Sequence, residues 1–222
     1  MTITQNILIK MINDRLKNEE YEWFDQAINL LSKQPTEAEF YQTMSLTGRK
    51  ISHQLLSLTT QEQDLIHQTI DDWLPVNWFI DQVVRLCFLN CLSSSEKRHN
   101  TWVETLWATA DSKELISFNQ GLILFENADV WLAKLQLACR SNVTDIFSSV
   151  ALNNAYPFYY FPDQSWNQMV LKTIHLGLPL EQIFGLKKRL NEELTRMIDD
   201  YMDERKSANR SIPDGVAGLN IS

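Results

Sequence analysis

The chain has 222 residues, of which 44% are hydrophobic and 22% are charged, and its formal net charge is -8. This length and hydrophobic content fit one large folded domain and exclude global disorder. The negative charge argues against general binding of nucleic acid, which needs clustered lysine and arginine to displace counterions from phosphate. Only 6 glycines and 6 prolines punctuate the sequence. That is too few for the turns of a many-stranded sheet, so we expect an all-α fold.

Apolar residues recur at helical spacing throughout the first part of the chain. The expected helices lie at residues 3–16, 23–31, 37–52 and 60–71. Leu74-Pro75 then precedes the apolar run WFIDQVVRLCFLNCL at residues 78–92. This run predicts a central helix that the proline begins and that is buried on most of its sides.

Shorter amphipathic segments fill the rest of the chain. The expected helices lie at residues 96–110, 112–125, 130–139, 142–152, 166–175 and 192–207, and the expected caps are Asp111, Asp163 and Asn191. Residues 153–162 are rich in aromatic side chains around two prolines and predict an ordered loop. We therefore expect about ten helices in one domain over residues 1–210, as an irregular bundle or as stacked helix pairs, and a frayed tail at 211–222.

The N-terminal stretch MTITQNILIKMINDRL has charged residues inside its apolar pattern and no small-residue cleavage site. No run in the chain approaches 18 apolar residues. These features predict a cytoplasmic protein without direct insertion into a membrane. Cys87, Cys91 and Cys139 lie among apolar residues, and we expect them to be reduced and buried.

Two carboxylate-x-x-His pairs, Asp64 with His67 and Glu96 with His99, have the spacing that places two metal ligands on one helical face. The second pair lies in the polar segment SSSEKRHN, whereas the ligands of a di-iron bundle project into an apolar core, so solvated surface is the preferred interpretation. The first two cysteines have no CxxC or HxxxH partner that would complete a zinc site. No GxSxG, GxGxxG or GxxxxGK[ST] motif occurs. We expect no metal, no cofactor and no catalytic residue that a motif would reveal.

Polar residues embedded among apolar or aromatic ones are the better candidates for a site, because burying them demands a specific partner. The candidates of this kind are Arg85, Arg140, Asn142, Asn154, Tyr156, Trp166, Asn167 and Lys172. Helical spacing allows Asp163, Asn167 and Lys172 to share a broad face. Two interpretations stay open: these groups line a polar pocket, or they cap helices and hold the aromatic loop.

The stretch from Arg140 to Arg210 resembles the conserved end of the EboA family. The most specific part is WNQMVLK at residues 166–172, followed by Gly185-Leu186, Arg189, Asn191 and Glu193-Leu194. Weaker similarity reaches upstream through Gly48-Arg49-Lys50 and the DQVVR segment. The resemblance therefore adds Arg49, Lys50, Arg189 and Asn191 to the candidate binding residues.

Members of that family are encoded beside a TatD-like metallohydrolase, a UbiA-like prenyltransferase and TIM-barrel proteins, in bacterial clusters linked to moving secondary-metabolite precursors toward the periplasm. This implied role in metabolite traffic, together with the absence of catalytic motifs, favours a non-enzymatic accessory or binding protein that uses a polar and aromatic surface or pocket in the C-terminal third of the chain. Its partners would be a small-molecule metabolite or other proteins of the same gene cluster. Two alternatives remain: an enzyme acting on a phosphorylated or prenylated metabolite, and a helical scaffold for protein interactions.

Overall fold

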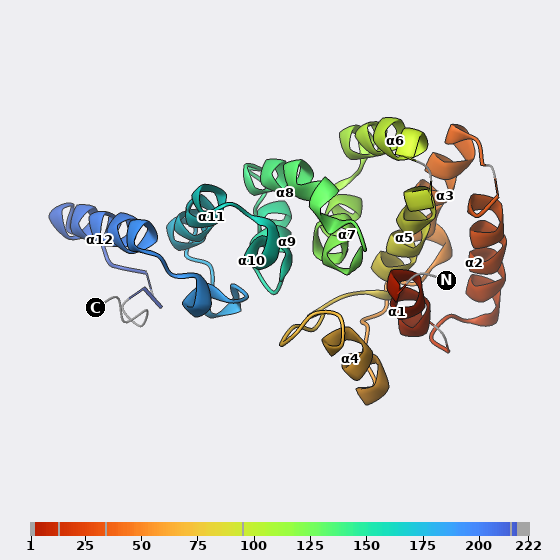
Figure 1. The fold of residues 1–222 in the computed structure, drawn as a ribbon, viewed down its shortest axis with the longest axis horizontal. Helices are drawn as coiled ribbons and strands as arrows, with labels where there is room; N and C mark the ends of the chain where they lie inside the picture. Colours follow the sequence, from red (N-terminus) through yellow and green to blue (C-terminus); the bar gives the residue numbers. More distant parts are fainter. Residues whose placement is uncertain (1–2, 13, 34, 95, 214, 217–222) are drawn as a thin grey trace. The chain divides into compact units, whose positions relative to one another are not determined.

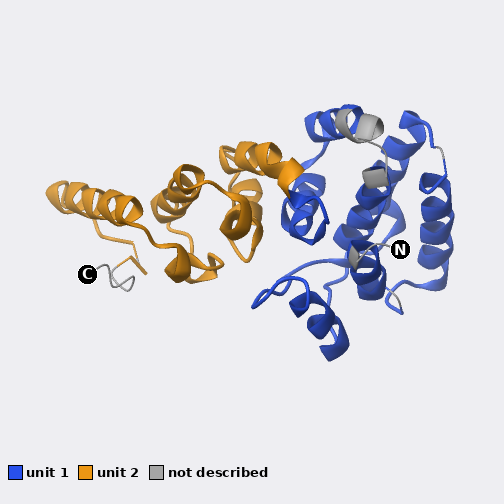
Figure 2. Ribbon diagram, in the orientation of Figure 1, with its two compact units in different colours: residues 1–128 blue, residues 129–222 orange. Residues whose placement is uncertain are grey.

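The computed structural model describes residues 3–12, 14–33, 35–94, 96–213 and 215–216. These residues contain twelve α-helices, five short 3-10 helices and no strand, apart from an isolated bridge between Leu55 and Phe79. The all-α prediction is confirmed. The chain divides into two compact units, residues 1–128 and residues 129–222 (Figure 2), and the prediction of one domain stays a prediction.

The first unit is built around one buried helix. Its α-helices are α1 (Ile3–Ile12), α2 (Asn18–Leu31), α3 (Glu37–Lys50), α4 (Thr60–His67), α5 (Ile80–Asn90), α6 (Glu96–Thr109) and α7 (Ser112–Gly121) (Figure 1). α5 packs against α1, α2, α3 and α7, and every residue from Ile80 to Leu89 is buried. A Cβ on Gly121 would lie 2.1 Å from the Leu86 side chain, so this glycine lets α7 approach α5 closely. The predicted burial of the central helix is confirmed.

The start of α5 was predicted wrongly, because Pro75 does not begin it. The segment before the helix is extended and pairs with residues 54–56: Leu56 N–H donates to the Trp78 carbonyl at 2.7 Å, and Ile80 N–H donates to the Gln54 carbonyl at 2.9 Å. These backbone bonds keep residues 78 and 79 extended, so the helix begins at Ile80. The first helical turn then forms with the Phe79 N–H donating to Gln82 Oε1 at 2.8 Å.

In the second unit, two helices make the contacts that join the others. Its α-helices are α8 (Leu132–Cys139), α9 (Thr144–Ala151), α10 (Tyr156–Tyr160), α11 (Asp163–His175) and α12 (Glu192–Ser207) (Figure 1). α9 contacts α8, α10 and α11, and α11 also contacts α12. The aromatic segment expected to be a loop contains the one-and-a-half-turn helix α10, which Pro157 favours because it stands in the first turn.

Two of the three predicted caps are correct. Asp111 accepts a hydrogen bond from the Glu114 N–H at 2.9 Å, and Asn191 accepts one from the Leu194 N–H at 2.8 Å. Asp163 does not cap α11: it is the first helical residue, and its carboxylate binds Arg189 instead. In the predicted tail, Val216 is buried and Arg205 donates to the Ser211 carbonyl, while residues 214 and 217–222 lie outside the described part.

Candidate functional site

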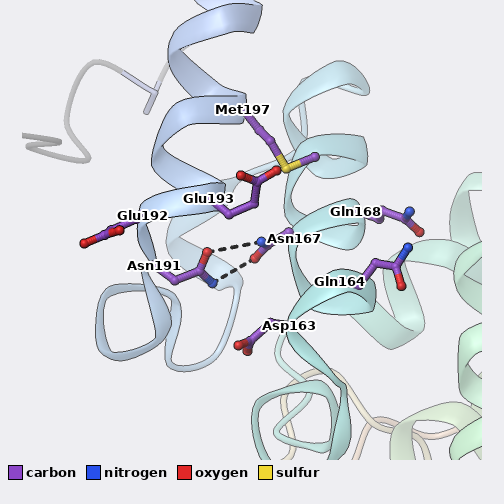
Figure 3. Close-up of a pocket in the computed structure, with 8 residues that line it drawn as sticks. All are labelled: Asp163, Gln164, Asn167, Gln168, Asn191, Glu192, Glu193 and Met197. Carbon is purple, nitrogen blue, oxygen red and sulfur yellow. Dashed lines mark hydrogen bonds between the residues drawn. The ribbon is translucent and has the colours of Figure 1, made fainter.

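Two hollows flank α11 within the second unit. The first, about 270 Å³, lies between α8 and α11 and is here called the α8–α11 cavity. It is lined by Gln136, Cys139, Arg140, Phe161, Ser165, Gln168, Met169 and Lys172. The second, about 690 Å³, lies between α11 and the start of α12 and is called the α11–α12 groove. It is lined by Asp163, Gln164, Asn167, Gln168, Asn191, Glu192, Glu193 and Met197 (Figure 3).

Arg189 holds the aromatic segment in place. Its guanidinium donates to the carbonyls of Pro157 at 2.7 Å, Phe158 at 3.1 Å and Phe161 at 2.6 Å. It also binds the Asp163 carboxylate at 2.8 Å. These carbonyls lie at the end of α10, where helical partners run out, so Arg189 acts as a side-chain cap. Arg189, which belongs to the most specific part of the family resemblance, therefore has a structural role.

Trp166 is buried beneath the Arg189 guanidinium and the aromatic segment that it holds, which together are called the Arg189 clamp. Its indole ring lies 4.7 Å from the Arg189 guanidinium carbon and contacts Phe158 edge-on. Its ring N–H has no hydrogen-bond partner among the described residues. Trp166 lines neither hollow, and we interpret it as the apolar support of the clamp.

Asn154 and Tyr156 are likewise internal. The Asn154 side chain donates to the Ser149 carbonyl at 2.9 Å and accepts from the Tyr156 N–H at 2.9 Å, which fixes the turn between α9 and α10. Burial raises the pKa of the Tyr156 hydroxyl, so this group stays protonated at neutral pH. Both residues stabilise the turn.

Asn167 and Asn191 bind each other across the α11–α12 groove. Each side-chain amide donates to the other's oxygen, at 3.1 and 3.0 Å, as the dashed lines in Figure 3 show. Met197 points toward α11 beside this pair, whereas Gln164 and Gln168 extend away from Asn191 (Figure 3). The amide pair joins α11 to the start of α12, and the carboxyl-bearing residues at the groove are Asp163, Glu192 and Glu193.

Lys172 and Arg140 both line the α8–α11 cavity but differ in their contacts. The Lys172 ammonium donates to the carbonyls of Cys139 at 2.9 Å and Ser141 at 2.7 Å, and it lies 4.5 Å from the centre of the Phe147 ring. It therefore caps the end of α8. Arg140 is exposed, and its guanidinium has no hydrogen bond or ion pair with any residue in the described ranges. Asn142 is also exposed and lines neither hollow.

The predicted shared face of Asp163, Asn167 and Lys172 is wrong. Lys172 lines the α8–α11 cavity, while the other two line the groove. The correct grouping is Ser165, Gln168 and Lys172, which recur at i, i+3 and i+7 and so lie on one helical face. Ser165 and Gln168 were not among the site residues predicted from the sequence, although this spacing could have revealed them.

The cavity also contains a neutral thiol. Burial raises the pKa of the Cys139 thiol to about 12, against the opposing influence of the Lys172 charge. A thiol with such a pKa is not a nucleophile at neutral pH. No group of three or more potential metal-binding side chains was found among the described residues, and the side chains of Glu96 and His99 lie outside them.

Arg85, the candidate in α5, is buried in the first unit. Its guanidinium donates to the Asp81 carboxylate at 2.7 Å, and the other Asp81 oxygen contacts the His53 ring at 2.8 Å. A Cβ on Gly48 would lie 3.0 Å from the Arg85 guanidinium, so the glycine leaves room for it. The upstream segments that carry the weaker resemblance therefore meet here.

Arg49 and Lys50 follow that glycine in the last turn of α3, and both are exposed. Cations at this position interact favourably with the partial negative charge at the end of a helix. Neither residue lines a hollow described above.

A family model described as metabolite traffic protein EboA matches residues 4–218, nearly the whole chain. The chain belongs to the EboA family. No curated protein and no solved structure matches it. The EboA match spans both units and includes every residue of the cavity and the groove.

The description of the EboA family supports a general role in metabolite traffic for this chain. Among the described residues, no helix is both long enough and apolar enough to cross a membrane. The named site residues of the EboA-family chain fall into two groups. Those that are buried or half-buried are engaged with the backbone or with other side chains, whereas Arg49, Lys50, Arg140 and Asn142 are exposed. Of these four, Arg140 lines the α8–α11 cavity, and its guanidinium has no hydrogen bond with a described residue.

Proposed function

We propose that this chain is a non-enzymatic binding protein that holds a small metabolite in the α8–α11 cavity. The observation that carries the proposal is the lining of that cavity. Gln136, Ser165 and Gln168 supply polar groups from two helices, and Phe161 and Met169 supply an apolar wall. Ligand sites combine apolar walls with a few placed polar groups in this way.

The groups in and near the cavity support binding rather than chemistry. The Cys139 thiol is protonated at neutral pH, and the Lys172 ammonium is engaged with two carbonyls. An activated nucleophile needs a lowered pKa or an adjacent general base. The Cys139 thiol lacks that environment, and the Lys172 amine is held by two carbonyls, which favours a carrier over an enzyme.

Within metabolite traffic, the ligand would be a secondary-metabolite precursor that moves toward the periplasm, and the chain would act on the cytoplasmic side. The gene neighbourhood that the family resemblance implies supports this direction. Proteins of the same cluster would supply the ligand or accept it. The family description itself supports only the general role.

The test is ligand retention by the purified chain. Wild-type protein is incubated with a small-molecule extract of producing cells and passed through a desalting column, and bound compounds are released by denaturation and identified by mass spectrometry. In the variant Ser165→Phe the added ring fills the cavity. In the matched control Gln164→Phe the same ring stands one residue away, at a position that lines only the groove.

We expect wild type and Gln164→Phe to retain the same compound and Ser165→Phe to lose it. Circular dichroism melting must show that both variants fold. Equal retention by Ser165→Phe would remove the cavity from the proposal. Release of a chemically altered compound would show catalysis and overturn the non-enzymatic role.

A further inference from the structure

The two hollows on α11 differ in charge. The α8–α11 cavity is lined by two cationic side chains, Arg140 and Lys172, and by no carboxylate. The α11–α12 groove is lined by three carboxylates, Asp163, Glu192 and Glu193, of which Asp163 is paired with Arg189 and Glu193 with Arg196. A cationic lining stands out in a chain with a formal net charge of -8. Because like charges repel and opposite charges attract, an anion would enter the cavity and avoid the groove.

The two cations of the cavity have different tasks. Lys172 donates to the Cys139 and Ser141 carbonyls and anchors the end of α8, so it contributes mainly its positive charge. Arg140 is the residue that follows the last helical residue of α8. Its guanidinium has five N–H donors in a fork that matches a carboxylate or a phosphate, and none is engaged by a described residue.

The rest of the lining fits a ligand with an apolar body. Gln136 donates to the Ser165 hydroxyl at 2.8 Å, so that hydroxyl keeps its own proton for a further acceptor. Phe161 and Met169 are nearly fully buried and present apolar surface. The Cys139 thiol is uncharged at neutral pH and does not repel an anion.

We infer that the α8–α11 cavity binds a small amphiphilic anion, with its carboxylate or phosphate on Arg140 and its apolar part against Phe161 and Met169. The inference rests on the proposed function and adds the chemical class of the ligand. A volume of about 270 Å³ lies just below the usual range of small-molecule sites, so the ligand is small. Arg140 is the specificity-determining residue.

Calorimetric titration with three related probes tests this inference. Phenyl phosphate and phenylacetate carry the two candidate anions, and 2-phenylethanol is a neutral compound of similar size. The variant Arg140→Gln removes the charge and keeps a shorter side chain that is still polar. Arg210→Gln is the control for net charge, because Arg210 is exposed and lines neither hollow.

We expect at least one anion to bind wild type and Arg210→Gln equally, and to bind Arg140→Gln at least tenfold more weakly. A ratio between the two anions identifies which headgroup the cavity prefers. The neutral alcohol should bind all three proteins weakly. Rising salt should weaken anion binding, since Arg140 is exposed and its charge is screened.

Two results would overturn the inference. The first is equal affinity of 2-phenylethanol and the acids. The second is anion binding that Arg140→Gln leaves unchanged. In either case, binding of the probes to Ser165→Phe is measured as well. If this variant does not bind them, the cavity is still the binding site, and only the proposal that its ligand is an anion is wrong. Failure of the proposed function is seen separately, as loss of metabolite retention by wild type.

Discussion

On the side of α11 that faces α12, the amides of Asn167 and Asn191 bind each other, and the Asp163 carboxylate binds Arg189, which also donates to three carbonyls. On the side that faces α8, the Arg140 guanidinium has no partner among the described residues. Lys172 and Gln136 on the α8 side are engaged with carbonyls and with Ser165, so the difference between the two sides lies in Arg140. Polar groups that bind one another stabilise the fold, whereas a polar group without a partner remains available for a ligand.

The charge of each side follows the same division. The groove carries carboxyl groups around an amide pair that joins two helices, and the cavity carries cations beside an apolar wall. Polar residues in an aromatic setting are therefore ambiguous until their partners are known. Variants and chemical probes of each side separate the two kinds of polar group.

The first prediction concerns the Cys139 thiol. Because burial raises its pKa from 9.0 to about 12, the thiolate fraction at pH 8 falls about 1,000-fold. Alkylation of Cys139 by iodoacetamide in the native chain should slow by about that factor relative to the chain in urea. The rate should rise about tenfold per pH unit between pH 7 and 10 without a plateau, because the pKa lies above that range.

Peptide mass spectrometry after timed alkylation measures these rates for each cysteine. The urea-unfolded chain is the control for intrinsic reactivity. Native Cys139 that reacts as fast as the unfolded control would have an ordinary pKa, and native Cys139 that reacts faster than the control would be an activated thiol. The contrast between a binding side and a structural side would then break, because the cavity would be equipped for covalent chemistry.

The second prediction concerns the arginine that holds the aromatic segment. Arg189→Ala removes four hydrogen bonds and leaves carbonyls of residues 157, 158 and 161 without this donor. The free energy of unfolding should fall by about 2–4 kcal/mol. Urea denaturation followed by tryptophan fluorescence measures the loss. The control Lys187→Ala, an exposed neighbour in the same turn, should stay within about 0.5 kcal/mol of wild type.

The third prediction concerns the amide pair. Asn167→Ala should lower the free energy of unfolding by about 1–2 kcal/mol, because it leaves the Asn191 amide without its partner. Asn191→Ala should cost more, since it also removes the cap on Leu194. A double-mutant cycle in urea should give a favourable coupling of about 1 kcal/mol, and additive losses would show that the pair contributes nothing.

The sequence predicts the all-α class, the burial of α5 and the caps at Asp111 and Asn191, because each depends on neighbours along the chain. Hydrophobic spacing and cap chemistry act within one or two turns, so they are visible without the fold. Pro75 shows the limit of this reasoning. The chain there pairs with residues 54–56, a contact that no local pattern reveals.

The site is less predictable for the same reason. The polar character of Arg189, Asn167 and Arg140 is plain in the sequence, but their partners come from segments about 20 to 30 residues away, or do not exist among the described residues. Helix geometry alone could have grouped Ser165, Gln168 and Lys172 on one face. It could not have shown that Lys172 caps α8 while Arg140 stays unengaged.

The last prediction has the smallest effect on stability and separates those two cations. Arg140→Ala should change the free energy of unfolding by no more than about 0.5 kcal/mol, because no described residue loses a hydrogen bond. Lys172→Ala, the matched comparison from the same cavity, should cost about 1–3 kcal/mol, since it leaves the Cys139 and Ser141 carbonyls without this donor. Urea denaturation of both variants without ligand measures the difference. A loss in Arg140→Ala as large as that in Lys172→Ala would make Arg140 a structural residue, and the two sides of α11 would then no longer differ.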